Sequence, residues 1–246
     1  MLKKFFFFFL FTVFLNASSI KVAVAANVSF AIDDLIAAFH TKYPEVKVDV
    51  ILGSSGKLNA QIKNGAPFDI FMSANMKYPQ DLYKYGFALN PPKLYALGGL
   101  AIFSTKKRDF SKGLSLLKQN SISRIAIANP KTAPYGKATQ EALKNAKIYD
   151  IVKSKFVYAQ SISQTVQYAI SATDIGFIAK SSLFSSKMKR FKQYINWVEI
   201  DKKLYTPIKQ GTIIIKNSKN IKEAKEFYDF IFTKSAQKVF KRYGYL

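Results

Sequence analysis

The stretch "VILGSSGKLNAQI", residues 50–62, decides the fold that we expect for this chain. An apolar run, Val50–Leu52, is followed by a glycine–serine turn, Gly53–Gly56, and a helical pattern begins at Leu58. This order is typical of a buried strand that turns into a helix. Because the first N–H groups of a helix have no partner within it, the turn can hold an anion. The stretch itself leaves open which anion binds and whether the anion is changed chemically.

Strands and helices alternate on both sides of this stretch. A strand is expected over Ile20–Ala25, followed by a helix whose N-cap is Ser29. Asp33 and Asp34 then lie in the first turns of that helix, near the positive end of its dipole. Further strands are expected over residues 46–52, 68–74, 97–105, 124–130, 156–161, 174–183 (the last leading into a short helix) and 210–218, and further helices over residues 58–65, 136–146, 162–171 and 221–246.

This alternation predicts an α/β fold in which mainly parallel sheets are flanked by helices. No proline- or serine-rich linker divides the chain, so we expect two α/β lobes joined by crossing strands, with a ligand in the cleft between them. Lobe I is expected to comprise residues 20–97 and 204–246, and lobe II residues 98–203. The C-terminal helices therefore return to lobe I.

The first 19 residues have the pattern of a secretory signal peptide. Lys3 and Lys4 precede an apolar block, Phe5–Leu15, and small residues follow it. The apolar block is shorter than the roughly 20 residues that span a bilayer, which makes an uncleaved anchor the weaker alternative. The chain contains no cysteine, which excludes disulfides and a lipid-modified cysteine. We expect a soluble periplasmic protein.

The formal net charge of +23 favours acidic partners, whether small anions, nucleic acid or anionic lipid. The lysines are nevertheless scattered, and the arginines (Arg108, Arg124, Arg190 and Arg242) lie far apart. A basic, solvated surface is therefore a better interpretation than a nucleic-acid site.

Four turns lie where a strand ends and a helix begins, which is where open α/β sheets bind ligands. They comprise residues 26–29, 53–57, 129–138 and 159–165. For any single turn, ordinary N-capping is a sufficient explanation. Convergence of all four would be a stronger indication of an anion site, because each turn contributes backbone N–H groups.

Enzymatic interpretations have little support in the sequence. Gly53 and Gly56 are too close together for a phosphate-binding P-loop, and "GSSGK" does not have the spacing of a nucleophile elbow. The single histidine, His40, falls late in a predicted helix, where a surface or helix-end role is expected. A zinc site of the common type is not expected either. We therefore expect binding without turnover, and no cofactor.

Five segments resemble the periplasmic molybdate-binding proteins of ABC importers, which are type II periplasmic binding proteins. The segments are "VAVAANVSFAIDDL", "GSSGKLNAQIKNGAPFDIFMSAN", "ANPKTAPYGKATQEAL", "DIGFIAKSSL" and the ending "FKRYGYL". This resemblance covers the chain after the signal peptide. It implies a periplasmic-binding-protein fold, a tetrahedral oxyanion (molybdate or tungstate) as ligand, and a membrane permease as partner.

The resemblance also implies the residues that bind the oxyanion. Asn27 falls at the position of a small polar ligand residue, beside a backbone donor at Ala26, and Ser55 matches the serine of the second loop. Tyr135 and Ile162 fall at backbone-donor positions of the third and fourth loops. One branch of the family has a further tyrosine where this chain has Ala179, so another hydroxyl, such as that of Tyr135, is expected to replace it.

These neutral donors suit a buried dianion, which can be fully hydrogen-bonded without a paired cation. Lys57 is accordingly expected to face solvent rather than act as a counter-ion. Donors without acceptors disfavour protonated oxyanions such as phosphate, whereas sulfate must be rejected by cavity size. The sequence leaves open a binder of sulfate, thiosulfate or an organic anion, and, less favoured, an exported enzyme or a nucleic-acid-binding protein. We expect a monomer.

Overall fold

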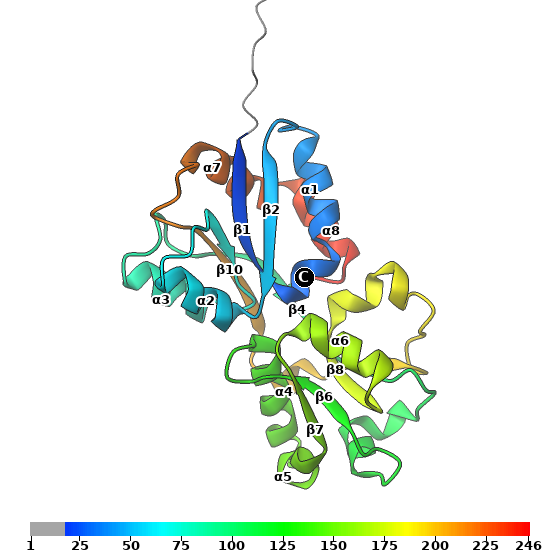
Figure 1. Cartoon of the computed structure of the whole chain (residues 1–246). Helices are drawn as coiled ribbons and strands as arrows, with labels where there is room; N and C mark the ends of the chain where they lie inside the picture. The colour runs from blue at the N-terminus through cyan, green and yellow to red at the C-terminus, as the bar shows by residue number, and fades with distance from the viewer. Residues whose placement is uncertain (1–17) are drawn as a thin grey trace, which may run out of the picture.

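The structure is a computed structural model that describes residues 18–246, and it consists of two lobes, each built on one five-stranded sheet (Figure 1). Lobe I holds β1 (Ser19–Ala25), β2 (Lys47–Gly53), β3 (Ile70–Met72), β4 (Lys93–Gly98) and β10 (Ile208–Ile214). Lobe II holds β5 (Leu100–Phe103), β6 (Ile125–Ala128), β7 (Phe156–Ala159), β8 (Ile175–Ala179) and β9 (Trp197–Glu199). The α/β, two-lobed fold predicted from the sequence is confirmed.

The two sheets share one plan, with strand orders β2-β1-β3-β10-β4 and β7-β6-β8-β5-β9. In each sheet the first three strands pair in parallel, and the fourth pairs antiparallel with both of its neighbours. The fourth strand, β10 or β5, is the one that has just crossed from the other lobe. Each sheet is therefore mixed, with four strands in one direction and the crossing strand in the other.

The chain crosses between the lobes twice. Only Gly99 separates β4 from β5, whereas residues 200–207 connect β9 to β10. Gly98, which we expected to begin lobe II, is the last residue of β4 in the first sheet. The domain boundaries given above otherwise stay a prediction.

Helices cover both faces of the lobe I sheet. On one face lie α1 (Ile32–His40), α7 (Ile221–Ile231) and α8 (Lys234–Arg242), and on the other lie α2 (Ser55–Lys63) and α3 (Lys77–Lys84) (Figure 1). Phe39 of α1 packs edge-on against Phe227 and Phe230 of α7, with ring centroids 5.0 and 5.4 Å apart. The C-terminal helices thus return to lobe I because their apolar faces complete its core.

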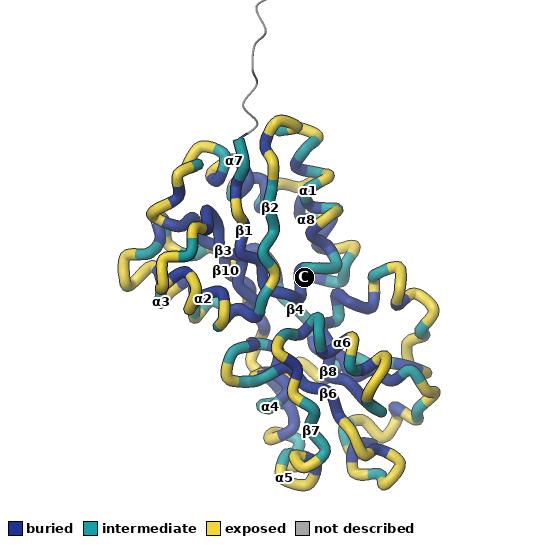
Figure 2. Tube along the Cα trace, in the orientation of Figure 1, coloured by how far each residue is buried: buried dark blue, intermediate teal, exposed yellow. Residues whose placement is uncertain are grey.

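Lobe II is covered in the same manner. On one face lie α4 (Pro134–Asn145), α5 (Tyr149–Val152) and η2 (Phe110–Lys118), and on the other lie α6 (Ile162–Ser171) and η4 (Lys180–Phe184). The remaining short 3-10 helices are η1 (Ala26–Phe30), η3 (Lys153–Lys155), η5 (Ser186–Met188) and η6 (Lys202–Leu204). Figure 2 shows that β3, β6 and β8 are buried, while exposed positions lie on the outer helices and loops.

The first helix differs from the one predicted. The chain leaves β1 into the 3-10 helix η1, and α1 begins only at Ile32, with Ala31 as an N-cap that makes no side-chain bond. Ser29 lies inside η1, so its predicted role as N-cap is wrong. Asp33 and Asp34 do lie in the first turn of α1. Ala26 and Asn27 therefore follow the carboxyl end of β1 directly, as the first residues of η1.

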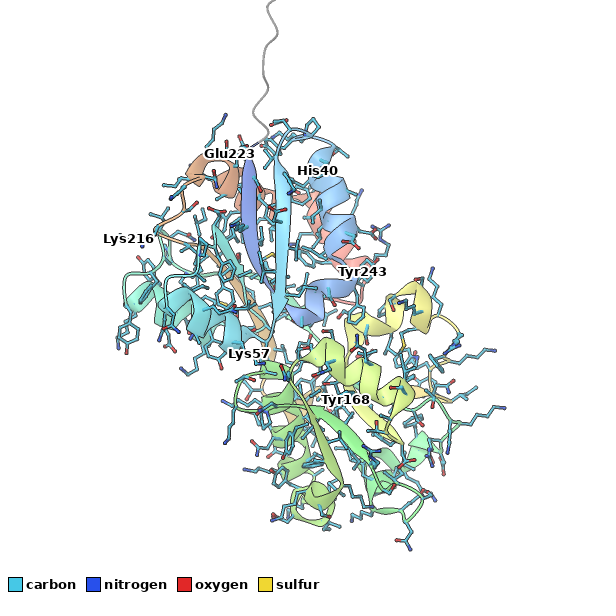
Figure 3. The ribbon with its side chains drawn as sticks, viewed as in Figure 1. His40, Lys57, Tyr168, Lys216, Glu223 and Tyr243 are labelled. Atoms are coloured by element: carbon cyan, nitrogen blue, oxygen red, sulfur yellow. The ribbon has the colours of Figure 1, made fainter. Side chains whose placement is uncertain are left out.

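The two lobes touch on both sides of their junction. The N–H of Gly56 donates to the carbonyl of Thr132 (2.9 Å), and Lys57 Nζ donates to Gln160 Oε1 (2.6 Å). Figure 3 shows Lys57 where the lobes meet. On the other side, Ser181 Oγ of η4 donates to the carbonyl of Asn27 (2.9 Å). The lobes are therefore held together by specific contacts that surround the ends of the strands.

The predicted signal peptide falls almost wholly on residues 1–17, outside the described residues. Ser18 and Ser19 belong to the described part: Ser19 begins β1, and the carbonyl of Ser18 accepts a bond from the N–H of Lys47 (2.8 Å). From residue 18 to the C-terminus, no helix is long and apolar enough to cross a membrane.

Candidate anion-binding site

A small cavity lies at the junction of the lobes, and residues from all four predicted turns line it. The lining residues are Ala25, Ala26, Asn27, Gly53, Ser54, Ser55, Ala74, Ala133, Pro134, Tyr135 and Ile162. All five residues that the resemblance implied for the site are in this set. The turns meet here because β1, β2, β6 and β7 all point their carboxyl ends at the boundary between the two sheets.

Ala26 and Asn27 form the edge of the cavity that follows β1. They are the first two residues of η1, where backbone N–H groups have no partner within the helix. The Asn27 side chain is fully buried. Its Nδ2 donates to Gln210 Oε1 (2.8 Å) and to the hydroxyl of Tyr245 (3.0 Å), while its Oδ1 has no partner within residues 18–246.

Two adjacent serines form the next part of the wall. Ser54 is the N-cap of α2 and Ser55 its first residue, and both are buried. Ser55 Oγ accepts a bond from the N–H of Ala74 (2.9 Å), which leaves the hydroxyl proton of Ser55 free to be donated elsewhere. Ser54 Oγ makes no capping bond and has no partner in the described chain. Two hydroxyl donors are therefore available at one helix start.

Lobe II contributes the starts of two longer helices. Pro134 is the first residue of α4, and Tyr135 follows it, so the N–H of Tyr135 is the first that α4 presents. Ile162 is the first residue of α6, whose N-cap, Ser161, accepts a bond from the N–H of Gln164 (3.2 Å). Ser161 Oγ also lies 3.1 Å from Ser163 Oγ, and the N–H of Ile162 has no partner within the helix.

Charged side chains are missing from the cavity wall among residues 18–246. Lys57 follows the two serines, is exposed, and bonds to Gln160. It faces solvent, as predicted from the sequence. His40 is the last residue of α1, and its Nε2 lies 2.9 Å from the carbonyl of Val46. Figure 3 shows His40 far from the junction of the lobes, so its predicted helix-end role is confirmed.

Ala179 stands where one branch of the family has a tyrosine. It is fully buried at the end of β8 and does not line the cavity. The Tyr135 hydroxyl is buried and has no partner among the described residues, and burial raises the pKa of this phenol well above its usual value. A Cβ placed on Gly98 would clash with this hydroxyl and would lie 2.9 Å from Gln210 Nε2. The Tyr135 hydroxyl therefore lies beside β4 and Gln210.

Sequence reasoning missed the residues behind the cavity, and it missed Ser54. The residues behind the cavity are Tyr95, Ser181, Gln210 and Tyr245. Each of the four hydrogen-bonds to Asn27 or to Gln210. Burial raises the pKa of Tyr245 to about 12, so its hydroxyl stays a donor throughout the physiological range. Ser181 and Tyr245 stand in the segments "DIGFIAKSSL" and "FKRYGYL" that carry the resemblance, whereas Tyr95 and Gln210 stand in no motif.

The groups that line this cavity suit a bound anion. Within the described chain no three or more histidine, cysteine, aspartate or glutamate residues are grouped to hold a metal ion. The wall supplies hydroxyl groups and backbone N–H groups at the starts of helices, which is the chemistry that suits an oxyanion.

The fold and this cavity define a class, the two-lobed solute-binding proteins. The chain belongs to the family of bacterial extracellular solute-binding proteins, which matches residues 20–246. It is 34% identical to the molybdate-binding protein ModA of Azotobacter vinelandii, over 94% of this chain and 90% of that protein. It is 31% identical to the ModA of Rhodobacter capsulatus, over 94% and 89% of the two chains.

A solved structure agrees with these relatives. The periplasmic molybdate-binding protein of Azotobacter vinelandii superposes with a TM-score of 0.85 at 31% identity, covering 92% of this chain and 98% of that one. The resemblance to the molybdate-binding proteins and the fold class predicted from the sequence are both confirmed.

Proposed function

We propose that this protein binds molybdate outside the cytoplasm and delivers it to the permease of an ABC importer. The observation that carries the proposal is that the five residues implied by the resemblance, which are scattered from residue 26 to residue 162, line one uncharged cavity between the lobes. Relatives named as molybdate-binding at 31–34% identity support the choice of anion.

In this proposal the oxyanion is held by donors from both lobes. Lobe I donates the hydroxyls of Ser54 and Ser55 and the backbone N–H groups of Ala26 and Asn27. Lobe II donates the N–H groups of Tyr135 and Ile162, each at the start of a helix whose dipole favours negative charge. Closure of the lobes around the anion brings the two sets of donors together, in a hinge motion at the two crossings.

Selectivity follows from the kinds of donor. A protonated oxyanion carries an O–H that needs an acceptor, and a wall of donors leaves that proton unpaired, which costs roughly 1–3 kcal/mol or more. Phosphate and arsenate are therefore disfavoured at neutral pH. Sulfate carries no such proton, so cavity size must exclude it. Molybdate and tungstate are so similar in size that we expect both to bind.

The remaining parts of the proposal concern the setting. We propose that residues 1–19 are removed as a signal peptide, and that the rest acts as a periplasmic monomer with neither a cofactor nor catalytic activity. The basic surface, part of a net charge of +23, raises the rate at which anions meet the protein, while the uncharged cavity decides which anion stays.

The test is isothermal titration calorimetry of refolded, ligand-free protein with molybdate, tungstate, sulfate and phosphate. Tight one-to-one binding of molybdate and of tungstate, and no heat from sulfate or phosphate, is expected. If sulfate bound with the same affinity as molybdate, the protein would be a binder of tetrahedral oxyanions in general and not of molybdate in particular. Absence of heat with both molybdate and tungstate would overturn the proposal.

A further inference from the structure

Asn27 is held from behind by a buried polar network. Gln210 Oε1 accepts bonds from Asn27 Nδ2 and from the hydroxyl of Tyr95, both at 2.8 Å. The Tyr245 hydroxyl donates to the carbonyl of Asn27 (2.8 Å), and so does Ser181 Oγ of lobe II (2.9 Å). Asn27 and Gln210 have no exposed surface at all. Such networks are costly to leave incomplete, because each unpaired group is out of reach of water.

Three atoms of this region nevertheless lack a partner among residues 18–246. They are Asn27 Oδ1, Gln210 Nε2 and the Tyr135 hydroxyl. The last two lie close together, because a Cβ on Gly98 would meet both. The orientation of the Asn27 amide is also unsuited to an anion. Both hydrogens of its Nδ2 point at the network, and the atom left over is an oxygen, which would repel an oxyanion in the cavity.

Reversal of the two neighbouring amides gives partners to Asn27 Oδ1 and Gln210 Nε2, the two unpaired amide atoms. Amide nitrogen and oxygen are nearly equal in size, so exchange by rotation about the terminal bonds needs no other movement. Gln210 Nε2 then donates to Asn27 Oδ1, in place of the present 2.8 Å bond from Asn27 Nδ2 to Gln210 Oε1. The Tyr245 hydroxyl, 3.0 Å away, donates to Asn27 Oδ1, and the Asn27 carbonyl keeps its bond from Ser181. Asn27 Nδ2 is released to donate toward the cavity. The Tyr95 hydroxyl accepts from Gln210 and keeps its donor for the carbonyl of Ser73, 3.4 Å away.

We propose that Gln210 is a positioning residue for the oxyanion site: it turns the Asn27 amide so that Nδ2, not Oδ1, faces the bound anion. This inference rests on the proposed function. Gln210 does not line the cavity and acts on the site only through Asn27. Because Gln210 lies on β10, the strand by which the chain returns to lobe I, the same residue links the site to the crossing between the lobes.

The proposal is tested by calorimetric titration with molybdate of Gln210→Leu, Asn27→Ala and the double variant. Gln210→Leu should weaken molybdate binding about 10- to 100-fold when Asn27 is present, as expected for loss of a hydrogen bond to a charged group. In the Asn27→Ala background the same change should cost less than about threefold. Equal losses in both backgrounds would show a merely structural role, and no loss in either would also overturn the proposal.

A second variant covers the case in which Gln210→Leu does not fold. In Gln210→Glu an ionised carboxylate cannot donate to Asn27, whereas the protonated acid can. Molybdate affinity of this variant should therefore fall as pH rises from 5 to 8, by about tenfold per unit above the pKa of the new carboxyl, while the wild-type affinity stays flat. A flat profile for the variant, with infrared spectroscopy showing that the new carboxyl ionises within this pH range, would contradict the proposal.

The matched control is Thr212→Val. Thr212 lies on the same strand, is equally buried, and has a side-chain oxygen without a partner within the described part of the chain. The affinity of the Thr212→Val variant for molybdate should equal that of the wild type. Thermal unfolding followed by circular dichroism checks that every variant folds. A wild-type protein that fails to bind molybdate would instead refute the proposed function, which keeps the two failures distinct.

Discussion

The two lobes contribute to the cavity in different ways. Lobe I presents polar side chains, Asn27, Ser54 and Ser55, and supports Asn27 with a buried network. Lobe II presents backbone groups at the starts of α4 and α6, and the side chain of Ile162 beside them is apolar. Recognition by side chains can be changed by substitution, whereas recognition by backbone N–H groups can be removed only by proline. The difference suggests that lobe I defines the ligand and lobe II completes its enclosure.

The largest effect is expected on the lobe I side, in Ser55→Ala. The change removes the proposed hydroxyl donor to the anion and also the acceptor for the N–H of Ala74, so binding should weaken by about 1–3 kcal/mol. Calorimetry with molybdate measures the loss. Ser104→Ala is the control, because Ser104 is also buried and accepts a backbone bond, from Lys106 (3.2 Å), but lies away from the cavity. If the wild type and Ser55→Ala bound molybdate with equal affinity, the proposed placement of the site at the start of α2 would be wrong.

The matching experiment on lobe II is Ile162→Pro. Proline is tolerated at the first position of a helix, and the preceding Ser161 already has the extended backbone that proline requires. The variant should keep α6 but lose one N–H donor, which weakens molybdate binding by about 1–2 kcal/mol. Ile162→Val keeps the N–H and should bind as the wild type does. If proline and valine behaved alike, the backbone role of lobe II would be wrong.

A smaller effect is expected from Gly56→Ala, which acts on the contact between the lobes. A Cβ on Gly56 would lie 2.8 Å from both the carbonyl of Thr132 and the hydroxyl of Tyr78, so the closed state should be destabilised by about 1 kcal/mol. Affinity should fall about fivefold, and small-angle scattering with saturating molybdate should show a larger radius of gyration. Ala60→Ser, at an exposed position of α2, should leave both values unchanged.

The smallest effect is expected for Lys57→Met. The bond from Lys57 to Gln160 is exposed to solvent, and such contacts contribute at most about 0.5 kcal/mol. Molybdate affinity at 150 mM salt should change by less than about twofold. A loss of a hundredfold would mean that Lys57 is a counter-ion for the anion, and the uncharged site would then have to be abandoned.

Local patterns predicted much of this molecule. The helix expected over residues 162–171 has the same limits in α6, because Ser161 is a capping residue and the apolar spacing is regular. The helix expected from Leu58 begins instead at Ser55, since the serine turn is already helical. The strand β9 was missed because three residues, Trp197–Glu199, carry too little pattern and become a strand only by pairing with β5.

The site could be predicted only as far as the turns that form it. Asn27, Ser55, Tyr135 and Ile162 stand in recognisable turns, and the resemblance to the molybdate-binding proteins implied their roles. Gln210 stands in an ordinary strand, 183 positions from Asn27, and nothing local connects the two. Their contact exists only because β10 is inserted beside β3, which is a property of the whole sheet.

The insertion of β10 between β3 and β4 also bears on how the chain folds. Every strand of lobe II lies within residues 100–199, whereas the lobe I sheet stays split until β10, at residues 208–214, arrives. Contacts that close long loops form late, because the entropy of closure must be overcome first. We expect lobe II to fold before lobe I. The single tryptophan, Trp197, lies in β9 of lobe II, so its fluorescence should recover during refolding before the capacity to bind molybdate does.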